Sequence, residues 1–147
     1  MNANHRFSRL VDIRRIREES RAASLAQAMT KLSELQQQLL SLQQETLAAQ
    51  QEARQSLMAE GQRLSPSLYE NYYKGQQWRE QRLCRFIDTA QQTVERNRDL
   101  WLEARKLLQQ VERLAEDAQL VREQTLRLQQ LKEMDQVGIT RYYQKDR

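Results

Sequence analysis

Apolar residues recur at alternating steps of three and four residues through both halves of the chain, and this spacing predicts long helices. In the first half the series is Leu25, Ala28, Leu32, Leu35, Leu39, Leu42, Thr46, Ala49, Ala53 and Ser56. In the second half it is Leu83, Phe86, Ala90, Thr93, Asn97, Leu100, Ala104, Leu107, Val111, Leu114, Ala118, Val121, Thr125 and Leu128. A stripe that keeps one register over so many steps is typical of a left-handed coiled coil.

Glycine and proline are scarce, and their positions divide the chain. Three glycines and one proline in 147 residues exclude a β-rich domain, which needs many turns. Gly61 and Pro66 suit the end of one helix and the start of the next, and Gly138 predicts a second stop. We expect an all-α fold in which two long helices form one antiparallel coiled-coil hairpin over residues 1–147, with a helix at about 6–60, a turn at 61–66, a helix at about 67–137 and a basic tail at 138–147.

The two stripes can face each other if the chain folds back at this turn. The residue numbers of facing positions should then add to about 128 or 129, which pairs Leu42 with Phe86 and Leu39 with Ala90. Pairs of large and small residues let the layers interdigitate. The predicted core is Leu25, Leu32, Leu35, Leu39, Leu42, Leu83, Phe86, Leu100, Leu107, Val111 and Leu114.

The second helix should extend beyond the first, which leaves Val121, Leu128 and Leu131 without a partner in the hairpin. Three explanations stay open. This stripe is a surface for another protein, the first helix begins earlier than predicted, or two molecules overlap there.

The composition argues against catalysis. Only one histidine, His5, is present, no His/Cys cluster has metal-ligand spacing, and no glycine-rich phosphate loop occurs. We therefore expect no enzymatic activity, no metal and no cofactor. The lone Cys84 has no internal disulfide partner and fits a reducing cytoplasm. No apolar run reaches the roughly 18 to 20 residues of a membrane span, so we expect a soluble protein.

Basic residues gather towards the two ends of the chain, whose net charge is +4. The predicted hairpin brings Arg6, Arg9, Arg14, Arg15 and Arg17 to the same end as Arg141. A solvated face, a nucleic-acid site, a membrane-binding helix and a contact with an acidic protein cavity are all possible readings. No aromatic stacking platform accompanies these arginines, which disfavours nucleic acid, and a narrow charged rod favours the protein cavity.

Aromatic residues gather just after the predicted turn. Tyr69 and Tyr72 extend the apolar stripe, whereas Tyr73 and Trp78 fall off it and are predicted as exposed anchors of a protein interface. Packing within the tip of the hairpin is the alternative for the cluster. Gly75 weakens this helix by about 1 kcal/mol relative to alanine, which marks a kink or the close approach of a partner.

Three stretches of sequence carry a family resemblance. Phe7-Ser8-Arg9-Leu10 leads into Ile13-Arg14-Arg15-Ile16-Arg17-Glu18-Glu19, an alanine-rich stretch follows at 21–28, and Lys132-Glu133-Met134-Asp135-Gln136 precedes Arg141-Tyr142. In these motifs, its length and its hairpin plan, the chain resembles the FliJ/YscO family of bacterial type III export apparatus proteins. The N-terminal pattern favours the flagellar branch of that family over the virulence-secretion branch.

The resemblance implies a non-enzymatic, cytoplasmic stalk that lies peripherally at the inner-membrane export apparatus. Its paired terminal helices would enter the ring of the export ATPase hexamer, with contacts at Arg6, Arg9, Arg14, Arg15, Arg17 and Arg141. The early part of the second helix would contact the cytoplasmic domain of the export gate, at Tyr72, Tyr73 and Trp78. Export chaperones are further partners of flagellar members, and nucleic acid is not expected. The alternative function is a generic coiled-coil adaptor or dimeric scaffold unrelated to secretion.

Overall fold

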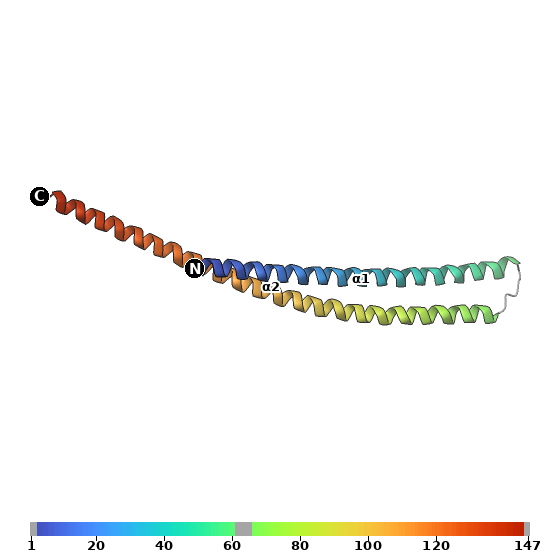
Figure 1. The fold of residues 1–147 in the computed structure, drawn as a ribbon. Coiled ribbons are helices and arrows are strands. Elements are labelled where there is room, and N and C mark those ends of the chain that lie inside the picture. The colour runs from blue at the N-terminus through green and yellow to red at the C-terminus, as the bar shows by residue number, and fades with distance from the viewer. Residues whose placement is uncertain (1–2, 61–65, 146–147) are drawn as a thin grey trace. The chain divides into compact units, whose positions relative to one another are not determined.

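The structure, a computed structural model, describes residues 3–60 and 66–145 and is all-helical over these residues. Helix α1 spans Ala3–Glu60 and helix α2 spans Pro66–Lys145 (Figure 1). The two helices pack against each other as in a helical hairpin, so the predicted all-α class is confirmed. Pro66 opens α2, where its fixed φ and missing N–H are tolerated. The rest of the predicted turn, 61–65, lies outside the described residues.

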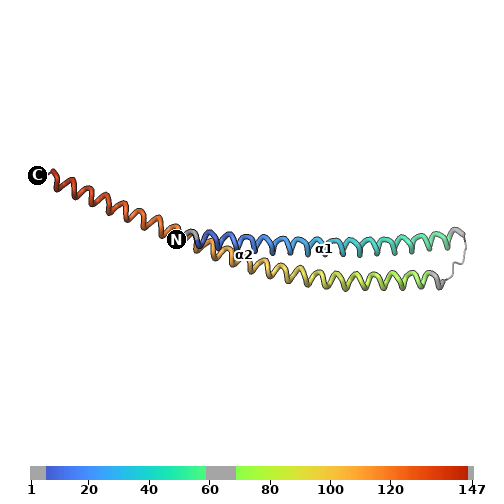
Figure 2. The backbone as a smooth tube through the Cα atoms, viewed as in Figure 1, coloured from blue at the N-terminus to red at the C-terminus, as the bar shows by residue number. Residues whose placement is uncertain are grey.

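Helix α2 does not stop at Gly138. It continues to Lys145 without interruption (Figure 2), so the predicted helix end and the separate basic tail are wrong. The reason is energetic, because glycine inside a helix costs only about 1 kcal/mol relative to alanine, while every further residue adds a backbone hydrogen bond. A Cβ at Gly138 would meet no atom within 4 Å, so packing does not require a glycine there.

The contacts of the chain group into two compact units. Unit 1 consists of Met1–Ser20 and Leu102–Arg147, and unit 2 consists of Arg21–Trp101. Each unit therefore contains a segment of both helices.

In unit 2 the contacts between the two segments define which residues face each other. Hydrogen bonds between α1 and α2 in this unit join Thr46 to Gln76, Ser24 to Asn97 and Gln43 to Glu80. The residue numbers of these pairs add to 122, 121 and 123. The predicted value of 128 or 129 is therefore wrong, and it differs from the observed pairing by one heptad.

The buried face of α2 in unit 2 also differs from the predicted stripe. Ile87, Ala90 and Val94 are buried, with Ile87 only 8% exposed, whereas Phe86 is 48% exposed. The seam, meaning the line of α2 side chains that packs on α1, thus follows Leu83, Ile87, Ala90, Val94 and Asn97. Every second member lies one residue later than predicted. Phe86 consequently lies on the flank of the seam and not in the core.

Unit 1 shows the same displacement, because Leu114 is 53% exposed while the following Ala115 is half-buried. The other predicted core residues lie at the seam. Leu42 is buried, and the half-buried ones are Leu25, Leu32, Leu35, Leu39, Leu83, Leu100, Leu107 and Val111. None of the large side chains in the described residues is fully buried, since two helices alone cannot surround a side chain.

Candidate interaction surfaces

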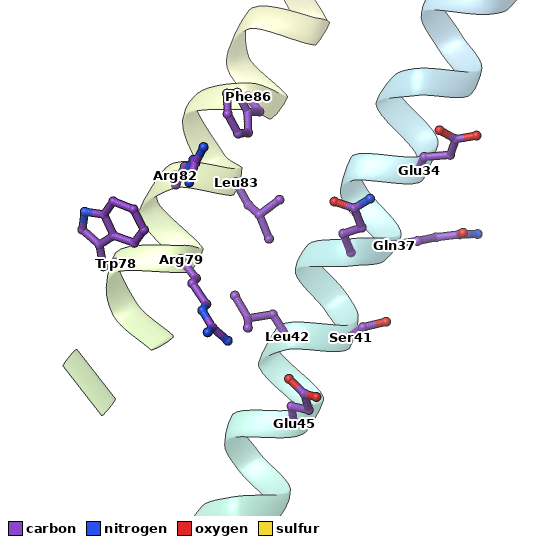
Figure 3. Close-up of a pocket in the computed structure, with 11 residues that line it drawn as sticks. Glu34, Gln37, Ser41, Leu42, Glu45, Trp78, Arg79, Arg82, Leu83 and Phe86 are labelled. Carbon is purple, nitrogen blue, oxygen red and sulfur yellow. The ribbon is translucent and has the colours of Figure 1, made fainter. Parts of the chain in front are cut away.

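A groove of about 720 Å³ runs between the helices of unit 2 (Figure 3). Leu42 of α1 and Leu83 of α2 point towards each other at its floor. The α1 side is polar and acidic, with Glu34 and Glu45, and the other lining residues are Gln37, Gln38, Ser41, Trp78, Arg79, Arg82 and Phe86. The two walls therefore differ in chemistry, with carboxylates and amides on the α1 side and arginines and aromatic rings on the α2 side.

The α2 wall is organised by one arginine between two aromatic rings. The Cζ of Arg82 lies 5.5 Å from the ring centroid of Trp78 and 5.5 Å from that of Phe86. These three residues are spaced by four along the helix, which places them on one face. Cation–π contacts hold the guanidinium over the rings. Trp78 stays 61% exposed within this stack. The stack itself was not predicted, although the spacing of four between its three residues is visible in the sequence.

Phe86 also borders a second, smaller groove. This groove has a volume of about 320 Å³, and its other lining residues are Ala28, Lys31, Leu35, Thr89, Ala90 and Thr93. The exposed ring of Phe86 is thus shared by both grooves, which gives unit 2 a partly apolar surface that reaches across several helical turns.

The tyrosines near the start of α2 form a ring cluster. Tyr73 stacks on Tyr69 with centroids 6.3 Å apart and meets Tyr72 edge-on at 5.5 Å. Tyr73 is half-buried, whereas Tyr72 is exposed, which is the reverse of their predicted roles. Of the three residues predicted to contact an export gate, Trp78 and Tyr72 are therefore exposed and Tyr73 packs at the seam.

The N-terminal arginines lie in unit 1. Arg6, Arg9 and Arg17 are exposed, and Arg14 is half-buried. Arg15 forms an ion pair with Glu112 of α2, with 3.9 Å between Nη2 and Oε1 and both side chains about half exposed. Exposed ion pairs are worth at most about 1 kcal/mol, so this pair adds little to stability.

Arg141 does not join this cluster. It lies 29 residues beyond Glu112 along α2, whereas Arg6 lies nine residues before Arg15. At a rise of 1.5 Å per residue, Arg141 and Arg6 are roughly 30 Å apart along the helix axis. The prediction that they share one end is wrong because α2 continues as a helix beyond Gly138, where a short basic tail was expected.

The part of α2 beyond Ala118 changes character within unit 1. Seam positions are half-buried as far as Ala118, and every residue of 119–145 is exposed. This segment nevertheless carries large apolar side chains, namely Leu120, Val121, Leu126, Leu128, Leu131, Met134, Val137, Ile139, Tyr142 and Tyr143. The apolar stripe predicted beyond the hairpin, at Val121, Leu128 and Leu131, is therefore exposed in this structure.

The described residues contain no group of three or more His, Cys, Asp or Glu side chains arranged to hold a metal ion. No helix among the described residues is long and apolar enough to cross a membrane. Matches to known proteins were also absent: no protein-family model, curated protein or solved structure matches the chain.

Proposed function

We propose that the protein is a stalk-like component of a flagellar or type III protein export apparatus, an antiparallel coiled-coil hairpin that couples the export ATPase ring to the export gate. The observation that carries the proposal is that one pair of packed helices exposes two different surfaces, one rich in arginine in unit 1 and one aromatic in unit 2. The N-terminal motif and its family resemblance support the same assignment. The role is mechanical and non-enzymatic, because coupling requires only that each partner state be bound differently.

The ATPase contact falls on the exposed arginines of unit 1. Arg6, Arg9 and Arg17 present forked guanidinium groups that suit carboxylates of a partner. Arg14 and Arg15 contribute less, since one is half-buried and the other pairs with Glu112. Arg141 lies farther along α2. Together with the apolar residues beyond Ala118, it therefore contacts the ATPase ring at a different position along the ring axis.

The gate contact falls on the larger groove of unit 2, which Trp78 and Phe86 line. Trp78 and Tyr72 supply exposed rings of the type that dominates binding energy at protein interfaces. The acidic residues on the α1 side of the groove and the arginines on its α2 side orient the cytoplasmic domain of the gate on this surface. Export chaperones are further partners, and attachment to the inner-membrane apparatus is peripheral.

The ATPase contact is tested by charge reversal. The variant Arg6→Glu/Arg9→Glu/Arg17→Glu should lose stimulation of the cognate ATPase and binding in a pull-down. A matched control, Arg54→Glu/Arg96→Glu/Arg98→Glu, changes the same charge at exposed positions of unit 2 and should retain both. Equal loss in both variants would mean that net charge alone matters, and no loss in either would remove the contact.

The gate contact is tested by removing exposed rings. Trp78→Ala should weaken binding to the gate's cytoplasmic domain by at least about 2 kcal/mol, as for a central aromatic anchor. The control Leu47→Ala removes an exposed apolar side chain of α1 outside the groove. The gate proposal is abandoned if Trp78→Ala binds as tightly as this control.

A generic adaptor or dimeric scaffold is the competing function, and the exposed apolar residues beyond Ala118 are the observation that favours it. Two copies that packed through this segment would have twice the monomer mass in sedimentation. Cys84 is exposed and would report a close parallel dimer by oxidative cross-linking. A monomeric mass at micromolar concentration would support the stalk and argue against the scaffold.

A further inference from the structure

Two amide side chains, Gln76 and Asn97, interrupt the apolar seam of α2 in unit 2, and the half-buried Glu80 lies between them. Gln76 is only 5% exposed and Asn97 is half-buried. They stand 21 residues apart, and each is separated from Leu83 by a whole number of heptads, so they occupy the same column of the seam. Burying an amide costs free energy unless it is hydrogen-bonded, so these two residues need hydrogen-bond partners.

Gln76 finds its partner on α1. Its Nε2 donates to Oγ1 of Thr46 at 3.3 Å and to the hydroxyl of Tyr72 at 3.2 Å, and its Oε1 accepts from Nη1 of Arg79 at 3.5 Å. The Thr46 hydroxyl donates its own proton to the carbonyl of Leu42 at 2.9 Å, which leaves its oxygen free to accept from Gln76. Tyr72 and Arg79 belong to α2, so of these three bonds the one with Thr46 depends on how the two helices are paired.

Asn97 makes the second polar contact across the seam. Its Nδ2 donates to the backbone carbonyl of Ser24 at 3.5 Å. This bond is long, but it selects the same pairing as the bond of Gln76, because both pairs have residue numbers that add to 121 or 122. Two contacts separated by six helical turns therefore agree on one register.

The apolar residues alone do not select this register. In the observed pairing Leu39 lies opposite Leu83, and a slip by one heptad would put Leu39 opposite Ala90. The slip moves one helix roughly 10 Å along the other and keeps leucines of α1 against apolar residues of α2. It is also the pairing that the hydrophobic pattern predicted from the sequence.

The polar contacts do not survive the slip. Gln76 would lie opposite Ala53, Thr46 opposite Leu83, and Asn97 opposite Leu32, so both amides would lose their partners on α1. We propose that the hydrogen bonds of Gln76 with Thr46 and of Asn97 with Ser24 lock the two helices into one of two heptad registers that the apolar seam allows. A single polar seam residue is known to fix register in coiled coils at some cost in stability.

Site-specific cross-linking distinguishes the two registers in the full chain. With Cys84→Ser as background, Leu39→Cys/Leu83→Cys reports the observed register and Leu39→Cys/Ala90→Cys reports the slipped one. A short bis-maleimide should join the first pair and leave the second unjoined, because the slip displaces the thiols by roughly 10 Å. Adding Gln76→Leu/Asn97→Leu should raise cross-linking of the second pair at least about tenfold, since the hydrogen bonds to Thr46 and Ser24 that favour the observed register are gone.

The matched control is Gln81→Leu/Gln92→Leu, which makes similar changes at exposed positions of α2 and should leave the second pair unjoined. Circular dichroism establishes that each variant stays helical. If the double leucine variant loses its helicity, Thr46→Val, which removes only the acceptor of Gln76, takes its place. The proposal is refuted if Leu39→Cys/Ala90→Cys cross-links equally well when Gln76 and Asn97 are unchanged. It is also refuted if helical variants that lack these hydrogen bonds still cross-link only through Leu39→Cys/Leu83→Cys.

Discussion

Replacing Ile87 and Phe86 by alanine measures which face of α2 packs on α1. Ile87 is 8% exposed, and truncation of a buried isoleucine costs 2 to 5 kcal/mol. The seam lies next to solvent and its neighbours can close over part of the space, so about 3 kcal/mol is expected for Ile87→Ala. Phe86 is 48% exposed, and part of its loss is offset by the higher helix propensity of alanine. We expect about 1 kcal/mol for Phe86→Ala.

The free energy of unfolding is measured by urea titration followed by far-ultraviolet circular dichroism. The two variants should differ by about 2 kcal/mol, with Ile87→Ala the less stable. Val94→Ala and Thr93→Ala form a second matched pair, since Val94 is buried and Thr93 is exposed. If Phe86→Ala and Thr93→Ala are the more destabilising members of their pairs, α2 packs through the stripe predicted from the sequence and the structural assignment of the seam is wrong.

Three further substitutions have definite expected outcomes. Gly75→Ala and Gly138→Ala should each stabilise the chain by about 0.5 to 1 kcal/mol in thermal melts. A Cβ at either position meets no atom within 4 Å, and alanine favours the helix. A loss of stability would mean that the helix is interrupted there. Arg15→Ala should cost less than about 1 kcal/mol, and the cost should shrink in high salt, because its ion pair with Glu112 is solvent-exposed. Cys84 is exposed, so Ellman's reagent should titrate one thiol in the native protein within minutes, and a protected thiol would contradict its placement.

Helix type and the start of α2 were predictable because they depend on local signals. The three-and-four spacing of apolar residues indicates helices, and Pro66 is favoured in a first helical turn. The end of α2 was not predictable from Gly138. A single glycine weakens a helix without ending it, and nothing in the local sequence reports how favourable continued propagation is.

The face on which α2 packs was a second feature that the sequence prediction got wrong. Apolar residues occupy both candidate stripes at Phe86 and Ile87 and again at Leu114 and Ala115, so counting matches cannot separate the two. The same displacement by one residue exchanged Tyr72 with Tyr73, of which the structure exposes the first and packs the second. Gln76 and Asn97 lie in the column that both stripes share, so their hydrogen bonds fix the register of the two helices and not the choice between the stripes. Exposure of Trp78 was predicted correctly for a related reason: it lies so far from both stripes that either choice leaves it in solvent.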